Sequence, residues 1–344
     1  MEDDVASIVR APNLRPQGVT PVLSFLARRC ASALPLLIGV LTLVFVLVEA
    51  APGDPFQIEP GPGVSREAAA HLREIYGTDR PFLQRYLAWL EGFLSFDLGV
   101  SLSYREPVAG LVRKALGNTL WLAGAALVLE FVLGTAAGVA AAWWQRRPLD
   151  RLVGGAATVL YSVPSFWLAL VLVFLLSVRL GWLPASQMHS IDVLELGAGP
   201  RLLDLLRHLV LPCLALALPS AAGIALYVRQ ELKDLLGRPF VRIARARGAG
   251  RVGIVLRHAL KNALVPVVNL FGVALPGLVG GSVVIEVLFA WPGMGRLAYQ
   301  AVLARDTPLV LGCVWVASLG VVGGSLAADL LSAVLDPRVR EAGP

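Results

Sequence analysis

The side chains best suited to binding in this 344-residue sequence gather in one strongly basic stretch, residues 238–266, which reads RPFVRIARARGAGRVGIVLRHALKNALVP. The stretch lies between two long apolar segments, and a connection of about 30 residues is too long to be a simple turn. A short helix with an apolar ridge and a cationic surround fits a groove on another protein. The same pattern suits a helix that rests on anionic lipid headgroups. The spacing alone leaves both interpretations open.

Within this stretch the spacing predicts a short helix that Pro239 can open. Three apolar side chains then fall at i, i+3 and i+4 on one face, namely Phe240, Ile243 and Ala244. The remaining positions carry arginines, namely Arg242, Arg245 and Arg247. Gly248 and Gly250 break the helix and permit a sharp turn. A second basic helix, residues 251–261, is expected to lead into the next apolar segment.

Other kinds of chemistry have little support in the sequence. It contains no G-x-x-x-x-G-K-[ST] phosphate-binding loop, no H-E-x-x-H and no G-x-S-x-G, and its four histidines are scattered. Its three cysteines lie in or beside apolar segments without ligand spacing, which favours packing over a metal site or a disulfide framework. We therefore predict that the chain is not an enzyme and binds no metal.

The elements that position the basic stretch are membrane helices. The chain is 56% hydrophobic and 16% charged, with a mean hydropathy of +0.70, whereas a soluble domain carries about a quarter charged residues. About 20 apolar residues cross a bilayer. We predict an all-α polytopic membrane protein with six transmembrane helices, at residues 30–50, 118–144, 152–178, 208–228, 265–288 and 309–335.

The orientation of these spans follows from the arginines and lysines. With the N-terminus inside, the inner segments hold 18 of them in 81 residues and the outer segments hold 12 in 119. The excess lies on the cytoplasmic side, as the positive-inside rule requires, so the net charge of +6 does not indicate nucleic acid. The inner segments are a flexible tail 1–29, the loop 145–151, the loop 229–264 and a tail 336–344, so both termini are expected in the cytoplasm.

The outer segment 51–117 is expected to fold as helices rather than as a linker. Residues 65–76 are predicted to form one helix, and Pro81 is well placed to begin another. Leucines recur at helical spacing on the second helix, at Leu83, Leu87, Leu90 and Leu94. We expect this leucine stripe to pack on the membrane domain.

Several residues inside the spans have specific expectations. Gly134 and Gly138 form a small-xxx-small pair, which predicts close helix contact. Glu130 lies near mid-membrane, where a carboxylate either faces a cavity or has a hydrogen-bonded structural role. Pro164 predicts a kink in the third span.

Motifs along most of the chain resemble the permeases of ABC importers, specifically the dipeptide/oligopeptide (and nickel) family. They are FVRIARARG (240–248), RHALKNALVPV (257–267), GGSVVIEVLFAWPGMGRL (280–297), RDTPLV (305–310), DPRVR (336–340), APGDP (51–55) and YGTDRPFLQRYLAWLEGFLSFDLGVSL (76–102). The resemblance covers residues 28–340 and implies a type I ABC-importer permease fold in the bacterial cytoplasmic (inner) membrane, with a core at residues 118–335. Peptides are the expected substrate, and nickel or glutathione are alternatives. An ion-coupled secondary transporter is a more distant alternative, because only Glu130 and Asp329 approach mid-membrane and no internal repeat is evident.

The resemblance also implies partners. They are a second permease subunit, two cytoplasmic ATPase subunits or one fused ATPase, an extracytoplasmic substrate-binding protein and the lipid bilayer. The ATPase subunits would use ATP and Mg²⁺, and this chain would bind no cofactor. The basic stretch would supply a coupling helix that contacts an ATPase through Phe240, Val241, Ile243, Ala244, Arg245 and Gly248. Arg242 stands where the wider superfamily often has a glutamate, and Pro239 departs from the usual acidic or polar residue.

No motif marks the substrate path. The candidates are Glu130, Ser162, Asn269, Ser282 and Glu286. The aromatic side chains of the outer segment are an alternative contact for the binding protein, at Phe82, Tyr86, Trp89 and Phe93.

Overall fold

The structure, a computed structural model, describes residues 20–50, 80–193, 197–248, 250–274, 277 and 283–335. These residues form helices and connecting loops, with one isolated β-bridge between Val100 and Pro107. Residues 1–40 and 41–344 form two compact units. By length and composition, four described helices could cross a membrane, and five if one bent pair counts as a single span. The four are α1 (Thr20–Ala50), α4 (Val108–Trp143), α7 (Ala198–Leu236) and α14 (Thr307–Leu335).

The bent pair occupies the third predicted span. Helix α5 (Pro148–Ser162) and the helical run through α6 (Ser165–Leu172) and the π-helix η1 (Val173–Arg179) meet at an angle of 106°. Proline disfavours helical geometry in the residue before it, and Val163 is extended, with φ −84° and ψ 126°. The kink predicted at Pro164 is therefore confirmed as a full break, and the segment is either a broken span or a re-entrant loop.

The fifth predicted span, residues 265–288, is described only in part. Helix α10 (Leu260–Ala274) covers its beginning and α12 (Val283–Leu288) its end. The residues between them lie, except for Gly277, outside the described part of the chain. The count of six spans consequently stays a prediction.

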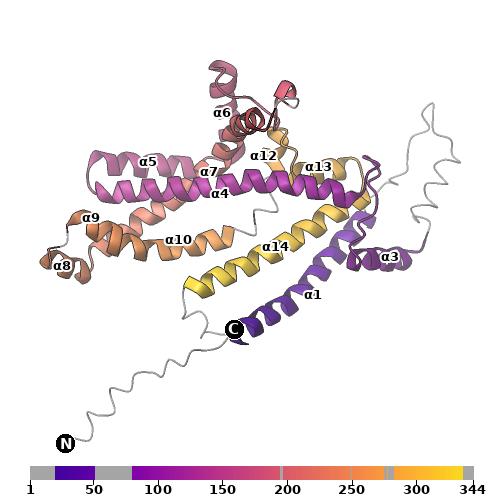
Figure 1. Cartoon of the computed structure of the whole chain (residues 1–344), viewed down its shortest axis with the longest axis horizontal. Helices are drawn as coiled ribbons and strands as arrows, with labels where there is room; N and C mark the ends of the chain where they lie inside the picture. Colours follow the sequence, from indigo (N-terminus) through magenta and orange to yellow (C-terminus); the bar gives the residue numbers. More distant parts are fainter. Residues whose placement is uncertain are drawn as a thin grey trace, which may run out of the picture. The chain divides into compact units, whose positions relative to one another are not determined.

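Helices α4 and α7 form the centre of the larger unit and pack backbone to backbone (Figure 1). A Cβ atom added at Gly134 would lie 2.7 Å from the carbonyl oxygen of Ala221, and one at Gly138 would lie 2.7 Å from that of Ala225. The predicted close contact at this glycine pair is confirmed. Helix α7 continues through Pro212 and Pro219.

Helix α4 begins at Val108, ten residues before the predicted start of the second span. The extra turns carry Arg113 and Lys114, which lower the local hydropathy and hide the helix from a search for apolar runs. Their inward face is apolar, because Val108 and Val112 are buried in a cluster with Leu309 of α14. Helix α4 therefore begins within the predicted outer segment 51–117.

Helix α3 (Phe82–Leu94) begins directly after Pro81, as predicted. The predicted leucine contact is wrong for Leu83, Leu87 and Leu94, which are all more than half exposed, whereas Leu90 is half-buried. The aromatic face packs instead. The ring of Phe45 in α1 lies 5.5 Å from that of Tyr86 and 5.0 Å from that of Trp89, and Phe93 lies 5.6 Å from Trp315 of α14.

Polar contacts explain the orientation of α3. The hydroxyls of Tyr86 and Thr42 lie 2.9 Å apart, and Arg85 forms an ion pair with Glu49. Both partners are in α1, so the aromatic side of α3 must face that helix. The helix predicted at residues 65–76 lies outside the described residues.

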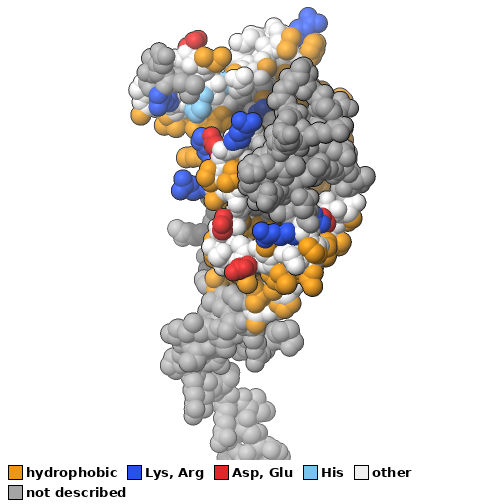
Figure 2. All heavy atoms as spheres, turned by 90° about the vertical axis from the view of Figure 1, so that its right-hand side faces the viewer, with side chains coloured by type: hydrophobic (Ala, Val, Ile, Leu, Met, Phe, Trp, Pro, Cys, Tyr) orange, Lys and Arg blue, Asp and Glu red, His pale blue; other side chains and the backbone are white. Residues whose placement is uncertain are grey.

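Large hydrophobic side chains are exposed on many described helices, among them Trp121, Val128 and Val132 of α4. Figure 2 shows one face on which hydrophobic side chains are exposed between a few charged groups. Exposed apolar area of this extent is unusual on a soluble monomer. It is expected where helices face lipid or another membrane subunit.

Candidate functional site

The basic stretch folds as the sequence predicts. Helix α8 (Pro239–Ala246) follows the end of α7 after a turn at Gly237 and Arg238. The chain turns at Gly248, whose φ of +81° lies in the left-handed region that favours glycine. No atom lies within 4 Å of a Cβ added there, so the backbone conformation and not space explains the glycine.

Helix α8 has one anchored and one exposed side. Val241 is 1% exposed, whereas Ile243 is 55% exposed. Arg242 and Arg247 are exposed and Ala244 is half-buried. The side chains of Phe240 and Arg245 lie outside the described part of the chain. The structure therefore presents Ile243 to the outside between arginines, and it turns Val241 inward.

The base under α8 is apolar. After Gly248 the chain continues through α9 (Arg251–Gly253) and the π-helix η3 (Ile254–Ala259) into α10, and α8 contacts η3. Ile254 and Val255 are each 2% exposed. The ends of α4, α7 and α10 meet here in one cluster, which comprises Ala142, Ile224, Val228, Leu232, Leu235, Ala259, Ala263 and Val267. Helix α8 thus stands on the packed end of the helix bundle.

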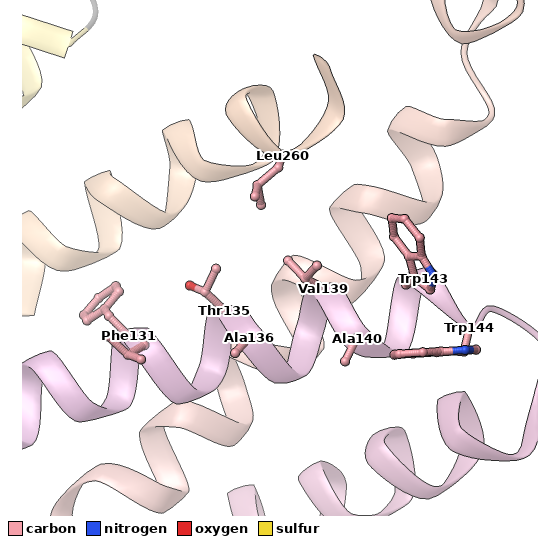
Figure 3. A pocket seen from close by; sticks show the side chains of 9 residues that line it. Phe131, Thr135, Ala136, Val139, Ala140, Trp143, Trp144 and Leu260 are labelled. Carbon is pink, nitrogen blue, oxygen red and sulfur yellow. The ribbon is translucent and has the colours of Figure 1, made fainter. Parts of the chain in front are cut away.

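Two hollows border this base. A small one of 250 Å³ lies between the ends of α4 and α7 and η3, and Gln145 and Lys233 are among its lining residues. A larger groove of 710 Å³ runs along α4 from Phe131 to Trp144, with Leu260 across it (Figure 3). Thr135 supplies the hydroxyl in that groove, and the other labelled side chains are apolar apart from the indole nitrogens of the two tryptophans.

A buried ion cluster lies beside the base. Asp150, in the first turn of α5, is 4% exposed. Its carboxylate accepts hydrogen bonds from Nε of Arg229 at 2.6 Å, from Nζ of Lys233 at 3.2 Å and from the backbone N–H of Arg146 at 3.0 Å. Asp150 belongs to the predicted loop 145–151, outside the predicted third span. Burial raises the pKa of Asp150, but these hydrogen bonds and the charge of Arg229 lower it to about 2.

The described substrate-path candidates have different hydrogen-bond partners. Glu130 of α4 is half-buried and hydrogen-bonded to Ser220 of α7. The hydroxyl of Ser162 is exposed and donates to the carbonyl of Thr158 at 3.0 Å. Ser282 lies outside the described residues, as does the side chain of Asn269. The structure does not join the described candidates in one site.

Glu286, the fifth candidate, is fully buried in what we term the Glu286 loop, residues 286–296. Its carboxylate accepts hydrogen bonds from the hydroxyl of Thr119 at 2.7 Å, from the backbone N–H of Arg296 at 3.0 Å and from that of Gly295. The Thr119 oxygen in turn accepts from the N–H of Met294 at 2.8 Å. The carboxylate is therefore occupied inside the chain, which favours a structural role over contact with substrate.

One close contact and two hydrogen bonds complete the Glu286 loop. A Cβ at Gly293 would lie 2.5 Å from the Glu286 carboxylate and from the Thr119 hydroxyl. The indole N–H of Trp291 donates to the carbonyl of Asn118, and the Asn118 amide donates to the carbonyl of Pro292, each at 2.9 Å. Thr119 was not among the predicted site residues. Its partner Glu286 lies 167 residues away along the chain, so no local pattern indicates the contact.

Residues with metal-binding side chains also come together at Asp204 of α7. Its carboxylate accepts from the backbone and hydroxyl of Ser190 at 2.9 and 2.8 Å, and lies 3.2 Å from Nδ1 of His189 and 3.3 Å from that of His208. Among the described residues no group of three or more histidines, cysteines and acids is arranged to hold a metal ion. The cluster joins the start of α7 to the preceding loop.

Most of the chain matches one known family. Residues 134–341 match the family described as "Binding-protein-dependent transport system inner membrane component". Residues 22–123 match the N-terminal part of the same kind of membrane component. Together the two matches run from residue 22, inside α1, to residue 341, beyond α14, with residues 124–133 between them.

Curated relatives match over nearly their full lengths. The oligopeptide transport system permease protein AppB of Bacillus subtilis is 34% identical over 92% of this chain and 99% of its own. A putative peptide permease of Brucella suis is 37% identical over 93% of this chain and 99% of its own. The glutathione transport system permease protein GsiC of Escherichia coli is 34% identical over 93% of this chain and 99% of its own.

Proposed function

Because the chain belongs to the family of binding-protein-dependent transport system inner membrane components, we propose that it is the permease subunit of an ATP-driven importer of peptides. In this role it forms half of a translocation path, and a second permease subunit forms the other half. An extracytoplasmic binding protein delivers the substrate. Relatives named for oligopeptides, peptides and glutathione, which is itself a tripeptide, support short peptides as the substrate.

The observation that carries the proposal is the exposed side of α8. Ile243 is 55% exposed among arginines at the end of the helix bundle, in a chain whose sequence contains no phosphate-binding loop. Energy from ATP must therefore enter through another subunit. A protein groove that accepts Ile243 and pairs with Arg242 and Arg247 explains both the apolar and the cationic side chains. Lipid headgroups alone would explain the arginines, with Ile243 buried in the bilayer interface.

The proposed placement in the membrane follows the sequence prediction. Six spans, both termini in the cytoplasm and α8 on the cytoplasmic side put Ile243 within reach of ATPase subunits. The partly described fifth span and the bent third span supply the two crossings beyond the four long helices. ATP and Mg²⁺ belong to the partner, either as two ATPase chains or as one fused chain.

Co-purification with the ATPase subunits tests the docking role. In the complete transporter, Ile243→Asp places a charge in the proposed contact, and we expect loss of at least about tenfold in ATPase binding, since a charge left in an apolar contact costs more than 1.4 kcal/mol. Ile191→Asp is the matched control, because Ile191 is 78% exposed in the predicted outer loop 179–207. Retained ATPase binding in Ile243→Asp would refute the assignment of α8.

Uptake into proteoliposomes tests the substrate. The transporter with its binding protein is offered labelled di-, tri- and pentapeptides, glutathione and Ni²⁺, each with and without ATP. We expect ATP-dependent uptake of one or more peptides. Uptake of Ni²⁺ alone would replace peptides as the substrate class while leaving the importer role in place.

A further inference from the structure

The Asp150 cluster joins two parts of the chain that are distant in sequence, the turn into α5 and the end of α7. Asp150 begins α5, Arg146 belongs to the turn between α4 and α5, and Arg229 and Lys233 lie one helical turn apart near the end of α7. Arg146 has a φ of +65°, a conformation that side-chain-bearing residues rarely adopt. The hydrogen bond from its N–H to Asp150 holds that turn. One carboxylate thus fixes both the turn and the neighbouring helix.

Helix α5 is held to α7 at its other end as well. A Cβ at Gly223 of α7 would lie 2.9 Å from the ring of Tyr161, so the ring lies directly on that glycine. Residue numbers rise along α5 from 150 to 161 while they fall along α7 from 229 to 223, so the two helices are antiparallel. Gly154 lies between the two contacts, and a Cβ atom added there would lie 3.4 Å from the guanidinium carbon of Arg229. Helix α5 therefore contacts α7 near both of its ends and between them.

The two ends of α5 lie near different parts of the chain. Lys233 lies three residues before the last residue of α7, and α8 follows directly after Gly237 and Arg238. At the other end α5 stops at the 106° break before Pro164, next to the exposed side chains of Tyr161, Phe166 and Trp167. Helix α5 is a direct connection between the end of α7 and this break, and α7 also contacts α6 beyond it.

We propose that Asp150 is a positioning residue that locks α5 to the end of α7, so that movement of α8 is transmitted to the break between α5 and α6. The inference rests on the proposed docking of an ATPase at α8. A buried carboxylate suits this role, because three donors from two directions fix its position, and loss of the carboxylate removes the partner that Arg229 and Lys233 share.

The test measures peptide imported per ATP hydrolysed in the reconstituted transporter with its partner subunits. For Asp150→Asn we expect ATPase binding and ATP hydrolysis to persist while this ratio falls about tenfold, within the range of coupling changes seen for mutations outside ligand sites. Asp150→Glu keeps the charge and should recover part of the ratio. Arg229→Gln should lower the ratio, and adding it to Asp150→Asn should have little further effect.

Asp204→Asn is the matched control, since Asp204 is also a buried, hydrogen-bonded aspartate, at the opposite end of α7. We expect it to leave the ratio unchanged even if it lowers thermal stability. An unchanged ratio in Asp150→Asn, or an equal fall in both variants, would overturn the inference. If Asp150→Asn fails to assemble, the part-exposed Arg229→Gln decides by the same ratio. A wild-type complex that neither binds the ATPase nor imports peptide would instead refute the proposed function.

Discussion

The Glu286 loop and helix α8 differ in what they bury. The loop encloses a carboxylate that is 0% exposed and satisfied by a hydroxyl and two backbone N–H groups. In helix α8, of the two large apolar side chains that the structure describes, Val241 is buried and Ile243 is exposed. The polar group is hidden in the first region, and the apolar group is exposed in the second.

This difference separates structural residues from docking residues. A buried charge with its hydrogen bonds made inside the chain needs nothing from a partner. An exposed isoleucine beside arginines has its apolar area in contact with solvent until another molecule covers it. Glu286 and Ile243 were both predicted to lie in functional sites, and their surroundings in the structure distinguish them.

The largest effect that tests the comparison is expected for Glu286→Ala. Removing the carboxylate leaves the Thr119 hydroxyl and the N–H groups of Gly295 and Arg296 without their acceptor, at about 1–3 kcal/mol for each buried group. We expect a large fall in the melting temperature of the purified permease, measured by tryptophan fluorescence. Glu286→Gln retains an acceptor oxygen, so its melting temperature should fall less. Equal stability of wild type and Glu286→Ala would show that the loop is not held by this carboxylate.

Gly293→Ala should have the next largest effect. Its Cβ would meet the Glu286 carboxylate and the Thr119 hydroxyl at 2.5 Å, and such overpacking costs about 1–3 kcal/mol. Gly117→Ala in α4 is the matched control, because no atom lies within 4 Å of its added Cβ. Alanine there should be neutral or stabilising by up to about 1 kcal/mol. The same thermal measurement checks both, and a harmless Gly293→Ala would contradict the packing described.

A smaller effect is expected in α8, because an eight-residue helix can detach without unfolding the rest. Val241→Asp should expose the α8 segment to hydrogen exchange in the isolated permease, since it puts a charge at a buried position. Ile243→Asp should leave exchange unchanged there, because the side chain is already exposed. Faster exchange in both variants would show that Ile243 also anchors the helix.

The smallest effect is expected at Leu87 of α3, which is 53% exposed. Leu87→Ser should change the stability by no more than about 0.5 kcal/mol. Trp89→Ser should cost far more, because it removes a ring packed 5.0 Å from Phe45. A large loss from Leu87→Ser alone would restore the leucine contact that the structure contradicts.

Local rules explain what the sequence could predict. Pro81 and Pro239 mark the starts of α3 and α8 because proline is favoured at a helix start, and Gly134 and Gly138 predict close contact because they lack side chains. The break at Pro164 follows from the restriction on the preceding residue.

Long-range partners explain what the sequence could not predict. Helical spacing identified an apolar leucine stripe on α3, but Thr42 and Glu49 of α1 select the adjacent face, which carries the aromatic side chains. The partner of Glu286 is a threonine on α4, and the partners of Asp150 are basic residues about 80 positions away. No periodicity within a segment encodes such pairs.

The glycine contacts between α4 and α7 also provide a frame of reference for spectroscopy. Because Gly134 and Gly138 bring the two backbones together without intervening side chains, these helices cannot approach further, and separating them would open a void. Spin labels placed on α4 and α7 should therefore keep one distance in every nucleotide state. Labels placed on either side of Val163 can be measured against that fixed pair, which would turn changes at the break into distances along a common axis.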